Sequence, residues 1–264
     1  MKALAALAVL LAVALPASAA AAPPTQTPGE LVVGVNLGEP GFEVGAVQGT
    51  KVVLARGLEI DLARALAQRL GIPKVTFVHE PVFSRLYAAG AKPWDLALAQ
   101  VTITPARSRN VAFSTPYLAA DQGVLVGQGV TAPTTVAELR TLQLCAQRGT
   151  TSVAAVTNVV KPERKLLLFD KQEGLFDALY QRRCQAVVND APLLAVIRKD
   201  DPGRYGALAG TLGTAESYGV VFPKGSRLVP DVDRALAALE QDGTIARLQK
   251  RWLGAEMSKL PALA

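Results

Sequence analysis

Short apolar runs alternate with amphipathic stretches along most of the chain. The apolar, β-rich run at 31–35 predicts a buried strand, and turn-forming residues follow it at 36–41. Leu62, Leu66 and Leu70 then share one helical face, which predicts an amphipathic helix that Asp61 caps and Gly71 ends. The same patterns predict the other elements of this half of the chain: strands at 75–78 and 96–102 and a helix at 84–89. Such alternation of strands and helices indicates α/β architecture with mostly parallel sheets.

The second half repeats this alternation with different residues. It predicts strands at 142–147, 165–169 and 186–188, and helices after Thr151 and at 174–181. Extended segments at 117–126 and 217–222 flank this unit, so we expect the chain to leave one lobe, build a second and return through a two-segment hinge. The expected boundaries are lobe one at 31–119, lobe two at 120–218, the return to lobe one at 219–256 and a tail at 257–264. The last helices, which carry apolar residues between Val232 and Trp252, should pack on lobe one.

The N-terminus has the pattern of a secretory signal peptide at 1–19. Lys2 precedes an apolar run that Pro16 ends, and small residues at 17–19 suit a signal peptidase. The alternative is an apolar helix that stays in the fold. Residues 20–30 are small, polar and proline-rich, so we expect a disordered lead-in. This start predicts export to a periplasm, and no cysteine lies near the cleavage site to carry a lipid anchor.

The length of the mature chain indicates its number of domains, and its charge argues against one class of function. Cleavage leaves 264 − 19 = 245 residues, which suits two domains. It also removes Lys2, so 28 − 1 = 27 basic residues face 22 acidic ones. This modest excess is spread along the chain, whereas a nucleic-acid-binding protein is expected to cluster Lys and Arg on one face.

The cysteines and the single histidine suggest no catalytic or metal centre. Cys145 and Cys184, both expected on strands of lobe two, either form a disulfide in an oxidising compartment or are two small buried apolar residues. His79 is the only histidine, so a histidine-based metal site or a Ser-His-Asp triad would depend on one residue. We interpret it as a structural residue at a strand end, and we expect no metal and no cofactor.

The segment 102–107 carries the strongest candidate chemistry. Thr104 can cap a helix whose first residue is Pro105, so the free N–H groups of the first turn form an anion site. Arg107 falls in that turn, where the helix dipole opposes a cation, and a bound carboxylate would satisfy both groups. Thr102 adds a hydroxyl donor. The alternative is an internal salt bridge or a solvated arginine beside a structural cap.

Several further motifs occur in an ordered series. They are 57–63 (GLEIDLA), 95–98 (DLAL), 102–107 (TITPAR), 111–117 (VAFSTPY), 149–151 (GTT), 184–190 (CQAVVND), 243–244 (GT) and 252–254 (WLG). In this order and approximate spacing, the sequence resembles the extracellular solute-binding proteins of polar amino-acid ABC transporters, family 3. The resemblance covers almost the whole mature chain.

The resemblance implies a two-lobed periplasmic binding protein-like fold of type II, with the ligand between the lobes. It implies that Arg107, Thr102 and Thr151 hold the ligand carboxylate. Asp190 and the backbone carbonyl of Gln100 would receive the ligand ammonium. The position of Asp190 after an apolar strand agrees with this role, although a helix cap before Pro192 is the alternative.

Departures from the family pattern concern the ligand side chain. Asn36, Glu39 and Phe42 are candidates because they follow the carboxyl end of a strand. Glu39 stands where the family often has an aromatic residue, and it either selects a basic side chain or points to solvent. Asn36 replaces a common acid and Gln100 a common glycine. Val82, Phe83 and Gln147 complete the expected side-chain pocket.

The predicted function is that of the periplasmic substrate-binding component of an ABC importer. A free amino acid would close the two lobes, and the closed, monomeric protein would deliver it to a membrane permease without itself spanning the membrane. Two rivals share the scaffold: an enzyme similar to periplasmic cyclohexadienyl dehydratases, and a ligand sensor that signals to a membrane partner. A dehydratase would need a general acid, for which Glu39 and Asp190 are the candidates.

Overall fold

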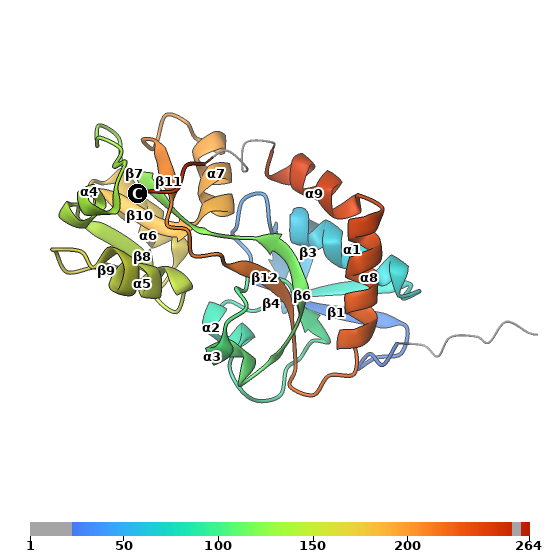
Figure 1. Ribbon diagram of the computed structural model, residues 1–264. Helices are drawn as coiled ribbons and strands as arrows, with labels where there is room; N and C mark the ends of the chain where they lie inside the picture. The colour runs from blue at the N-terminus through green and yellow to red at the C-terminus, as the bar shows by residue number, and fades with distance from the viewer. Residues whose placement is uncertain (1–22, 255–259) are drawn as a thin grey trace, which may run out of the picture.

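The computed structural model describes residues 23–254 and 260–264. The chain forms two lobes, each built around its own sheet, with two crossing segments between them (Figure 1). The predicted signal peptide at 1–19 lies outside the described residues. Within the described part, no helix combines the length and apolar character that a membrane crossing requires.

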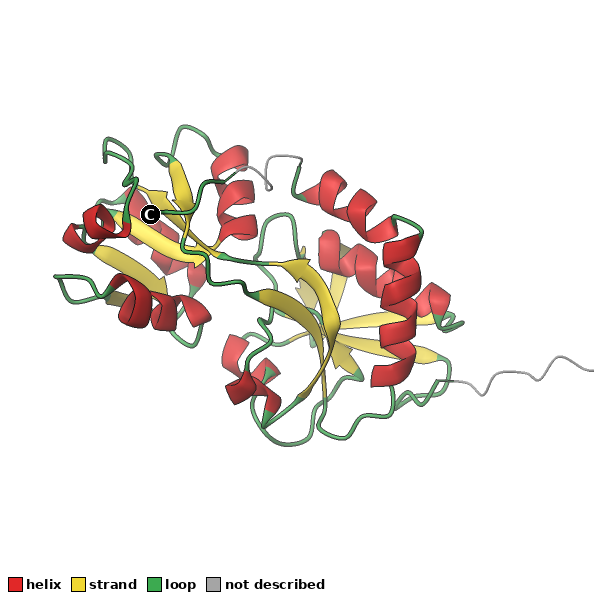
Figure 2. Cartoon of the chain, viewed as in Figure 1, coloured by secondary structure: helices red, strands yellow, loops and turns green. Residues whose placement is uncertain are grey.

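The first lobe contains a seven-stranded sheet with strand order β2-β3-β4-β1-β5-β12-β6. Its strands are β1 (Glu30–Val35), β2 (Val44–Gln48), β3 (Lys51–Arg56), β4 (Lys74–His79), β5 (Leu96–Ala97), β6 (Ala112–Ala119) and β12 (Ser217–Phe222). Its helices are α1 (Leu58–Arg69), α2 (Phe83–Leu86), α3 (Pro105–Ser108), α8 (Val229–Gln241) and α9 (Thr244–Trp252). Helices α8 and α9 pack with α1 on this lobe, as predicted (Figure 2).

The second lobe contains a five-stranded sheet with strand order β11-β7-β10-β8-β9. Its strands are β7 (Gln122–Val126), β8 (Leu144–Gln147), β9 (Leu167–Phe169), β10 (Ala186–Asp190) and β11 (Leu208–Thr211). Its helices are α4 (Val136–Thr141), α5 (Thr151–Ala155), the π-helical turn η1 (Val156–Val160), α6 (Gln172–Tyr180) and α7 (Ala191–Asp200). A disulfide joins Cys145 on β8 to Cys184, which lies in the loop before β10 and not on a strand as expected.

Both sheets are mixed, whereas the sequence pattern predicted mostly parallel ones. β1 pairs in parallel with β4 and β5, and β8 pairs in parallel with β9 and β10. The β2–β3 hairpin and the strands next to the crossings pair antiparallel. A hairpin or a direct return of the chain reverses strand direction, and only crossover connections keep strands parallel.

The chain changes lobes between β6 and β7 and again between β11 and β12. The two crossings run side by side, and the backbone N–H of Ala120 donates to the carbonyl of Glu216 at 2.8 Å. Ser217 and Tyr218, which were predicted to end the second lobe, instead pair with Ala119 and Leu118 in the first sheet. The Tyr218 ring is fully buried in the first lobe.

Helix α1 begins differently from the prediction. Its N-cap is Gly57 at φ 134°, and Asp61 lies inside the first turn, where its carboxylate accepts from Trp252 Nε1 at 3.0 Å. A Cβ at Gly57 would lie 1.9 Å from the carbonyl oxygen of Phe42, so packing against the preceding loop requires glycine.

The predicted disorder at 20–30 is wrong for the residues that the structure describes from 23 onward. The backbone N–H of Gln26 donates to Asp95 Oδ1 at 2.6 Å, and its side-chain amide donates to the carbonyl of Trp94 at 2.7 Å. The other oxygen of Asp95 accepts from the Val32 N–H at 2.8 Å. This buried carboxylate therefore ties the lead-in to β1, a contact across many residues that local composition does not reveal.

The C-terminal residues return to the second lobe. Thr211 N–H donates to the carbonyl of Pro261 at 2.9 Å, and Leu263 N–H donates to the carbonyl of Thr211 at 2.8 Å. This pairing covers the outer edge of β11, where unpaired backbone groups would otherwise face solvent.

Candidate functional site

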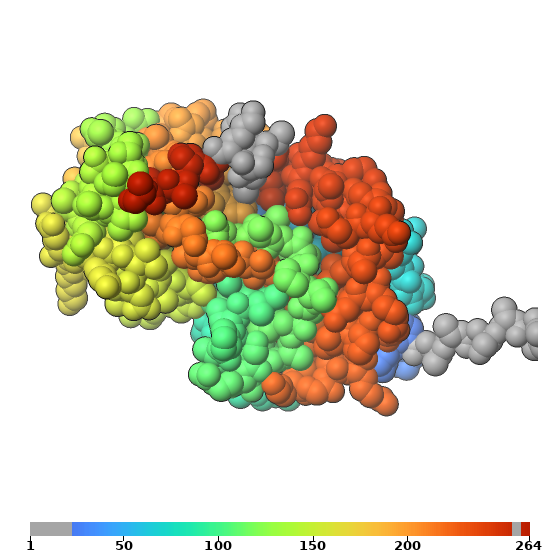
Figure 3. All heavy atoms as spheres, viewed as in Figure 1, coloured from blue at the N-terminus to red at the C-terminus, as the bar shows by residue number. Residues whose placement is uncertain are grey.

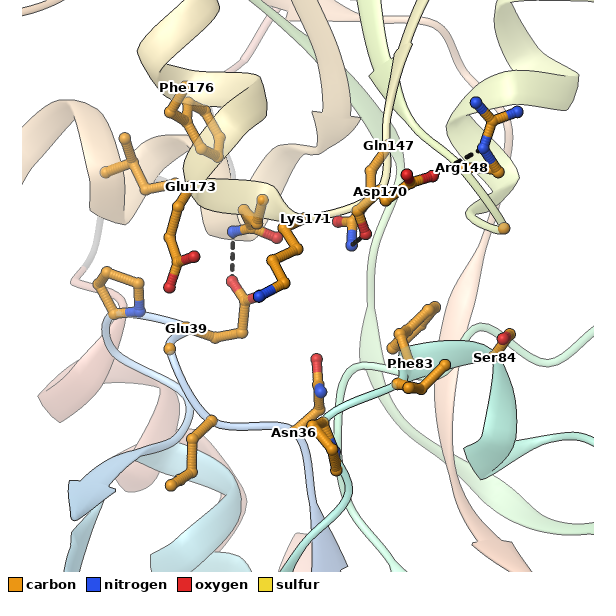
Figure 4. Close-up of a pocket in the computed structure, with 18 of the residues that line it drawn as sticks. Asn36, Glu39, Phe83, Ser84, Gln147, Arg148, Asp170, Lys171, Glu173 and Phe176 are labelled. Atoms are coloured by element: carbon orange, nitrogen blue, oxygen red, sulfur yellow. Dashed lines mark hydrogen bonds and ion pairs between the residues drawn. The ribbon is translucent and has the colours of Figure 1, made fainter. Parts of the chain in front are cut away.

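Two connected cavities lie between the lobes. The outer cavity has a volume of about 850 Å³ and the inner pocket about 30 Å³. Figure 3 shows the notch between the two lobes, and Figure 4 shows the residues around the outer cavity. Five residues line both cavities: Asn36, Glu39, Phe83, Gln147 and Gln172. These residues come from both lobes, so the cavities form one cleft.

Asp190 lies at the carboxyl end of β10 and lines the inner pocket. Its carboxyl group accepts hydrogen bonds from Tyr218 Oη at 2.5 Å and from Gln122 Nε2. The pKa of Asp190 is raised from 3.8 to about 7, mainly by burial and in smaller part by the Glu216 carboxylate, while the Tyr218 hydrogen bond opposes the rise. Asp190 occupies the N-cap position of α7, but its side chain makes no capping hydrogen bond. Asp190 therefore does not act as the side-chain cap of α7, which was the alternative role that its position before Pro192 suggested.

Gln100 faces Asp190 across the inner pocket from the first lobe. The strand predicted at 96–102 ends at Ala97, and Gln100 adopts a left-handed conformation with φ 53°. Its backbone N–H donates to Glu59 Oε1 at 2.8 Å, and its side-chain amide donates to Glu43 Oε2 at 2.7 Å. Its carbonyl accepts no backbone hydrogen bond within the described part of the chain, so it is available to a ligand.

Glu39 reaches across the cleft from the loop after β1. Its carboxyl oxygen accepts a hydrogen bond from Gln172 Nε2 at the start of α6 (Figure 4). Burial raises the pKa of Glu39 from 4.5 to about 8, with smaller contributions from Asp190 and Glu59, while the Gln172 bond opposes the rise. Glu39 thus lies in the cleft and does not point to bulk solvent.

Arg107 lies in the helical turn that the sequence predicted. Thr104 caps α3, and its hydroxyl accepts from the Arg107 N–H at 3.1 Å. The guanidinium donates to the carbonyl of Thr102 at 2.9 Å and, across the cleft, to the carbonyl of Gly149 at 3.2 Å. It also stacks on the Tyr87 ring, 4.3 Å from the centroid. These contacts hold Arg107 outside both cavities, with 7% of its surface exposed.

The two threonines of the expected carboxylate site make different contacts. Thr102 is buried and pairs with Tyr218 in an isolated bridge. Thr151 begins α5, donates from its hydroxyl to Glu216 Oε2 at 2.5 Å and accepts from Gln122 Nε2 at 3.1 Å. Because Gln122 also bonds Asp190, Thr151 and Asp190 belong to one network at the hinge.

The structure places the expected side-chain pocket residues in the cleft, with the exception of Phe42. Asn36, Phe83 and Gln147 line both cavities, and Val82 lines the outer one. Phe42 instead lies in the core with no exposed surface, its ring edge-on to Tyr218. The prediction for Phe42 is wrong because the loop folds back through hydrogen bonds between Glu39 and Glu43, which turn Phe42 inward.

Sequence reasoning missed part of the cleft wall. His79 lines the outer cavity, and so do Gln172 and Phe176 on α6 and Tyr205. Asn189 lines the inner pocket. The start of α6 directly follows the carboxyl end of β9, so the same topological rule that selected Asn36 could have found Gln172. Tyr205 comes from a loop beyond α7 and carries no such signal.

The described residues contain no group of three or more His, Cys, Asp or Glu side chains arranged to hold a metal ion. What the cleft offers is hydrogen bonding and charge: a buried carboxyl on one lobe, a free carbonyl on the other and aromatic walls.

Comparison with known proteins decides the family. The model of the bacterial extracellular solute-binding proteins, family 3, matches residues 31–255. The chain belongs to this family. The fold is accordingly that of the type II periplasmic binding proteins, whose solved structures it resembles.

Individual relatives match most of the chain. ABC transporter arginine-binding protein 1 of Escherichia coli is 27% identical over 74% of this chain and 81% of its own length. The histidine-binding periplasmic protein of Salmonella typhimurium is 26% identical over 93% of this chain and 96% of its own. Among solved structures, an ancestral amino acid-binding protein described as a precursor of cyclohexadienyl dehydratase superposes with a TM-score of 0.72, 29% identity and coverage of 85% and 95%.

Proposed function

We propose that this family 3 protein is the substrate-binding component of an amino-acid ABC importer and holds a free amino acid between its lobes. One observation carries the proposal. The buried Asp190 of the second lobe and Gln100 of the first lobe line the same pocket, and we propose that one ligand ammonium group contacts the Asp190 carboxylate and the Gln100 carbonyl. A ligand that bridges the two groups stabilises the closed arrangement of the lobes.

The proposed carboxylate site is made of Arg107, Thr102 and Thr151. In the present conformation, the Gly149 carbonyl occupies one donor of Arg107. A ligand carboxylate is a stronger acceptor than a neutral carbonyl, and the guanidinium can bind it through two parallel N–H bonds. We therefore propose that the carboxylate replaces Gly149 when the lobes open and close on the ligand.

The cavity sizes indicate how the ligand fits. The inner pocket of about 30 Å³ holds about one water molecule. An amino acid must therefore separate Glu39 from Gln172 and extend into the outer cavity, between Phe83 of lobe one and Phe176 of lobe two. We propose Asn36, Glu39, Val82, Phe83 and Gln147 as the residues that contact its side chain.

The cellular setting is part of the same proposal. The signal-peptide pattern at 1–19 and a relative named as periplasmic support export to the periplasm. We propose that the protein delivers its ligand to a membrane permease as a monomer, and the resemblance to an ABC transporter binding protein supports the permease as partner.

We propose binding without turnover. Both candidate general acids have proposed roles as ligand contacts: Asp190 for the ligand ammonium group and Glu39 for its side chain. If the purified protein converts an added ligand to a product detectable by NMR, the dehydratase-like alternative replaces this proposal.

A thermal-shift screen against the twenty standard amino acids tests the proposal. A ligand at one hundred times its Kd stabilises the native state by about 2.7 kcal/mol, which raises Tm by several degrees. The Arg107→Ala variant is the matched control and should show no shift with the same ligand. If no amino acid raises the Tm of the wild-type protein, the proposal is wrong.

A further inference from the structure

Two glutamates lie completely buried beneath the inner pocket. Glu43 follows the Glu39 loop, Glu59 lies in the first turn of α1, and neither has exposed surface. Two ionised carboxylates in contact inside a protein repel each other and lose their hydration, so such pairs hold a proton.

The hydrogen bonds around the pair account for two of its four oxygens. Glu59 Oε1 accepts from the Gln100 N–H at 2.8 Å and from Tyr117 Oη, and Glu43 Oε2 accepts from Gln100 Nε2 at 2.7 Å. Glu43 Oε1 and Glu59 Oε2 accept no hydrogen bond from any group in the described part of the chain, and the two side chains are near enough to affect each other's protonation through a hydrogen bond. A proton on Glu43 that is donated to Glu59 satisfies both oxygens at once.

Gln100 is the residue that both carboxyl groups hold. Its left-handed φ of 53° is unfavourable for a residue with a side chain, and such strain persists only where surrounding contacts enforce it. Glu59 holds its backbone N–H and Glu43 holds its side chain. The pair thereby fixes the peptide unit whose carbonyl meets the ligand.

We propose that Glu43 and Glu59 share one proton and act as positioning residues, which hold Gln100 in its strained conformation so that its carbonyl faces the ligand ammonium. This inference rests on the proposed amino-acid binding function for its effect on affinity. The proton itself is a property of the ligand-free protein.

The groups that surround Glu43 and Glu59 favour a proton on this pair. Burial raises the pKa of Glu43 well above 4.5, and Glu59 and Glu39 raise it further, while the Gln100 amide opposes the rise. Asp190 on β10 and the hydroxyls of Tyr117 on β6 and Tyr218 on β12 are the other titratable groups nearby. Because the pKa of Glu43 is raised, native Glu43 binds more protons than it does in the unfolded chain above pH 4.5, so its contribution to stability falls as pH rises past that value.

Infrared spectroscopy of the ligand-free protein in D₂O tests the shared proton directly. At neutral pH the wild-type protein should show the C=O band of a protonated carboxyl group that is absent from Glu43→Gln. Glu39 and Asp190 contribute equally to both spectra and cancel in the difference. Identical spectra would show that Glu43 carries no proton and would overturn the inference.

Four variants test the positioning role: Glu43→Gln, Glu43→Met, Gln100→Gly and the double variant Glu43→Met with Gln100→Gly. Glutamine can donate to Glu59 and accept from Gln100 as protonated Glu43 does, so its affinity should equal that of the wild-type protein. Methionine keeps the volume but not the hydrogen bonds, and we expect it to weaken binding roughly tenfold. Glycine adopts the left-handed conformation without support, so Glu43→Met should cost less than about threefold in the Gln100→Gly background.

These effects are measured as Kd values by titration calorimetry, for each of the twenty standard amino acids that shifts the wild-type Tm. The Tm of each ligand-free variant is the folding control. An equal loss from Glu43→Met in both backgrounds would mean that the pair acts by packing alone and would overturn the inference. If no amino acid binds the wild-type protein, the proposed function fails, while the infrared difference and the coupling of the two substitutions in Tm still decide the role of the pair.

Discussion

Arg107 of the first lobe donates a hydrogen bond to the backbone carbonyl of Gly149 in the second lobe, at 3.2 Å. Tyr87, on which the guanidinium stacks, donates to the same carbonyl at 2.6 Å. The turn before α5 in the second lobe thus contacts Arg107 of the first lobe, which we expect to bind the ligand carboxylate. This contact and the Glu39–Gln172 bond join the lobes at separate points of the cleft.

Replacement of Arg107 should abolish binding of every ligand alike. Each hydrogen bond to a charged group contributes about 1.5–3 kcal/mol, so Arg107→Ala should weaken binding by 10²-fold or more. Arg107→Lys keeps the charge but not the paired N–H donors and should recover only part of the affinity. Titration calorimetry measures both variants. A loss confined to some ligands would assign Arg107 to side-chain recognition instead.

Asp190 should make affinity and stability depend on pH in opposite directions. Its pKa of about 7 in the ligand-free protein means that a proton must leave before the carboxylate binds an ammonium group, so affinity should rise as pH increases toward 7. The raised pKa also means that ligand-free stability falls between pH 3.8 and about 7, because the unfolded chain ionises first. Kd values and melting temperatures across this range check both trends.

The Asp190→Asn variant is the control for that titration. It should bind weakly at every pH and should lose the part of the stability change that Asp190 causes. If the affinity of the wild-type protein keeps the same value below and above pH 7, Asp190 is not the ammonium site.

Glu39 should decide which ligand is preferred. Glu39→Gln keeps a carbonyl oxygen for the Gln172 amide and removes the carboxylate that a basic side chain would meet once Glu39 has released its proton. We expect it to lower the affinity for arginine or lysine by about tenfold or more, and to change the affinity for glutamine little. Competition between arginine and glutamine measures this preference. An unchanged ratio of the two Kd values would remove Glu39 from side-chain selection.

The Cys145–Cys184 disulfide should stabilise the second lobe. It links residues 39 positions apart, and a loop of that length corresponds to about 4 kcal/mol of chain entropy as an upper value. Cys145→Ala with Cys184→Ala should lower the free energy of unfolding by about 2–4 kcal/mol, measured by denaturant titration. Cys184→Ala alone should have a similar effect, since one substitution already removes the bond. A double variant as stable as the wild-type protein would contradict this expectation.

Local features of the sequence determined the elements and the family. The Thr104 cap and Pro105 predict α3 and the place of Arg107, and alternating apolar runs predict most strands and helices, because caps, turns and periodicity depend on neighbouring residues. The ordered motifs indicated the family because their residues, their order and their approximate spacing can all be read directly from the sequence.

Contacts between distant residues were decided by the tertiary structure alone. Phe42 was expected in the cleft and lies in the core, and Cys145 was found to bond Cys184. Neither the Glu43–Glu59 pair nor the bond from Glu39 to Gln172 has a signal in local sequence. A side chain acquires its partner only when the folded chain brings another segment beside it, and the resulting burial and hydrogen bonds set its charge and conformation.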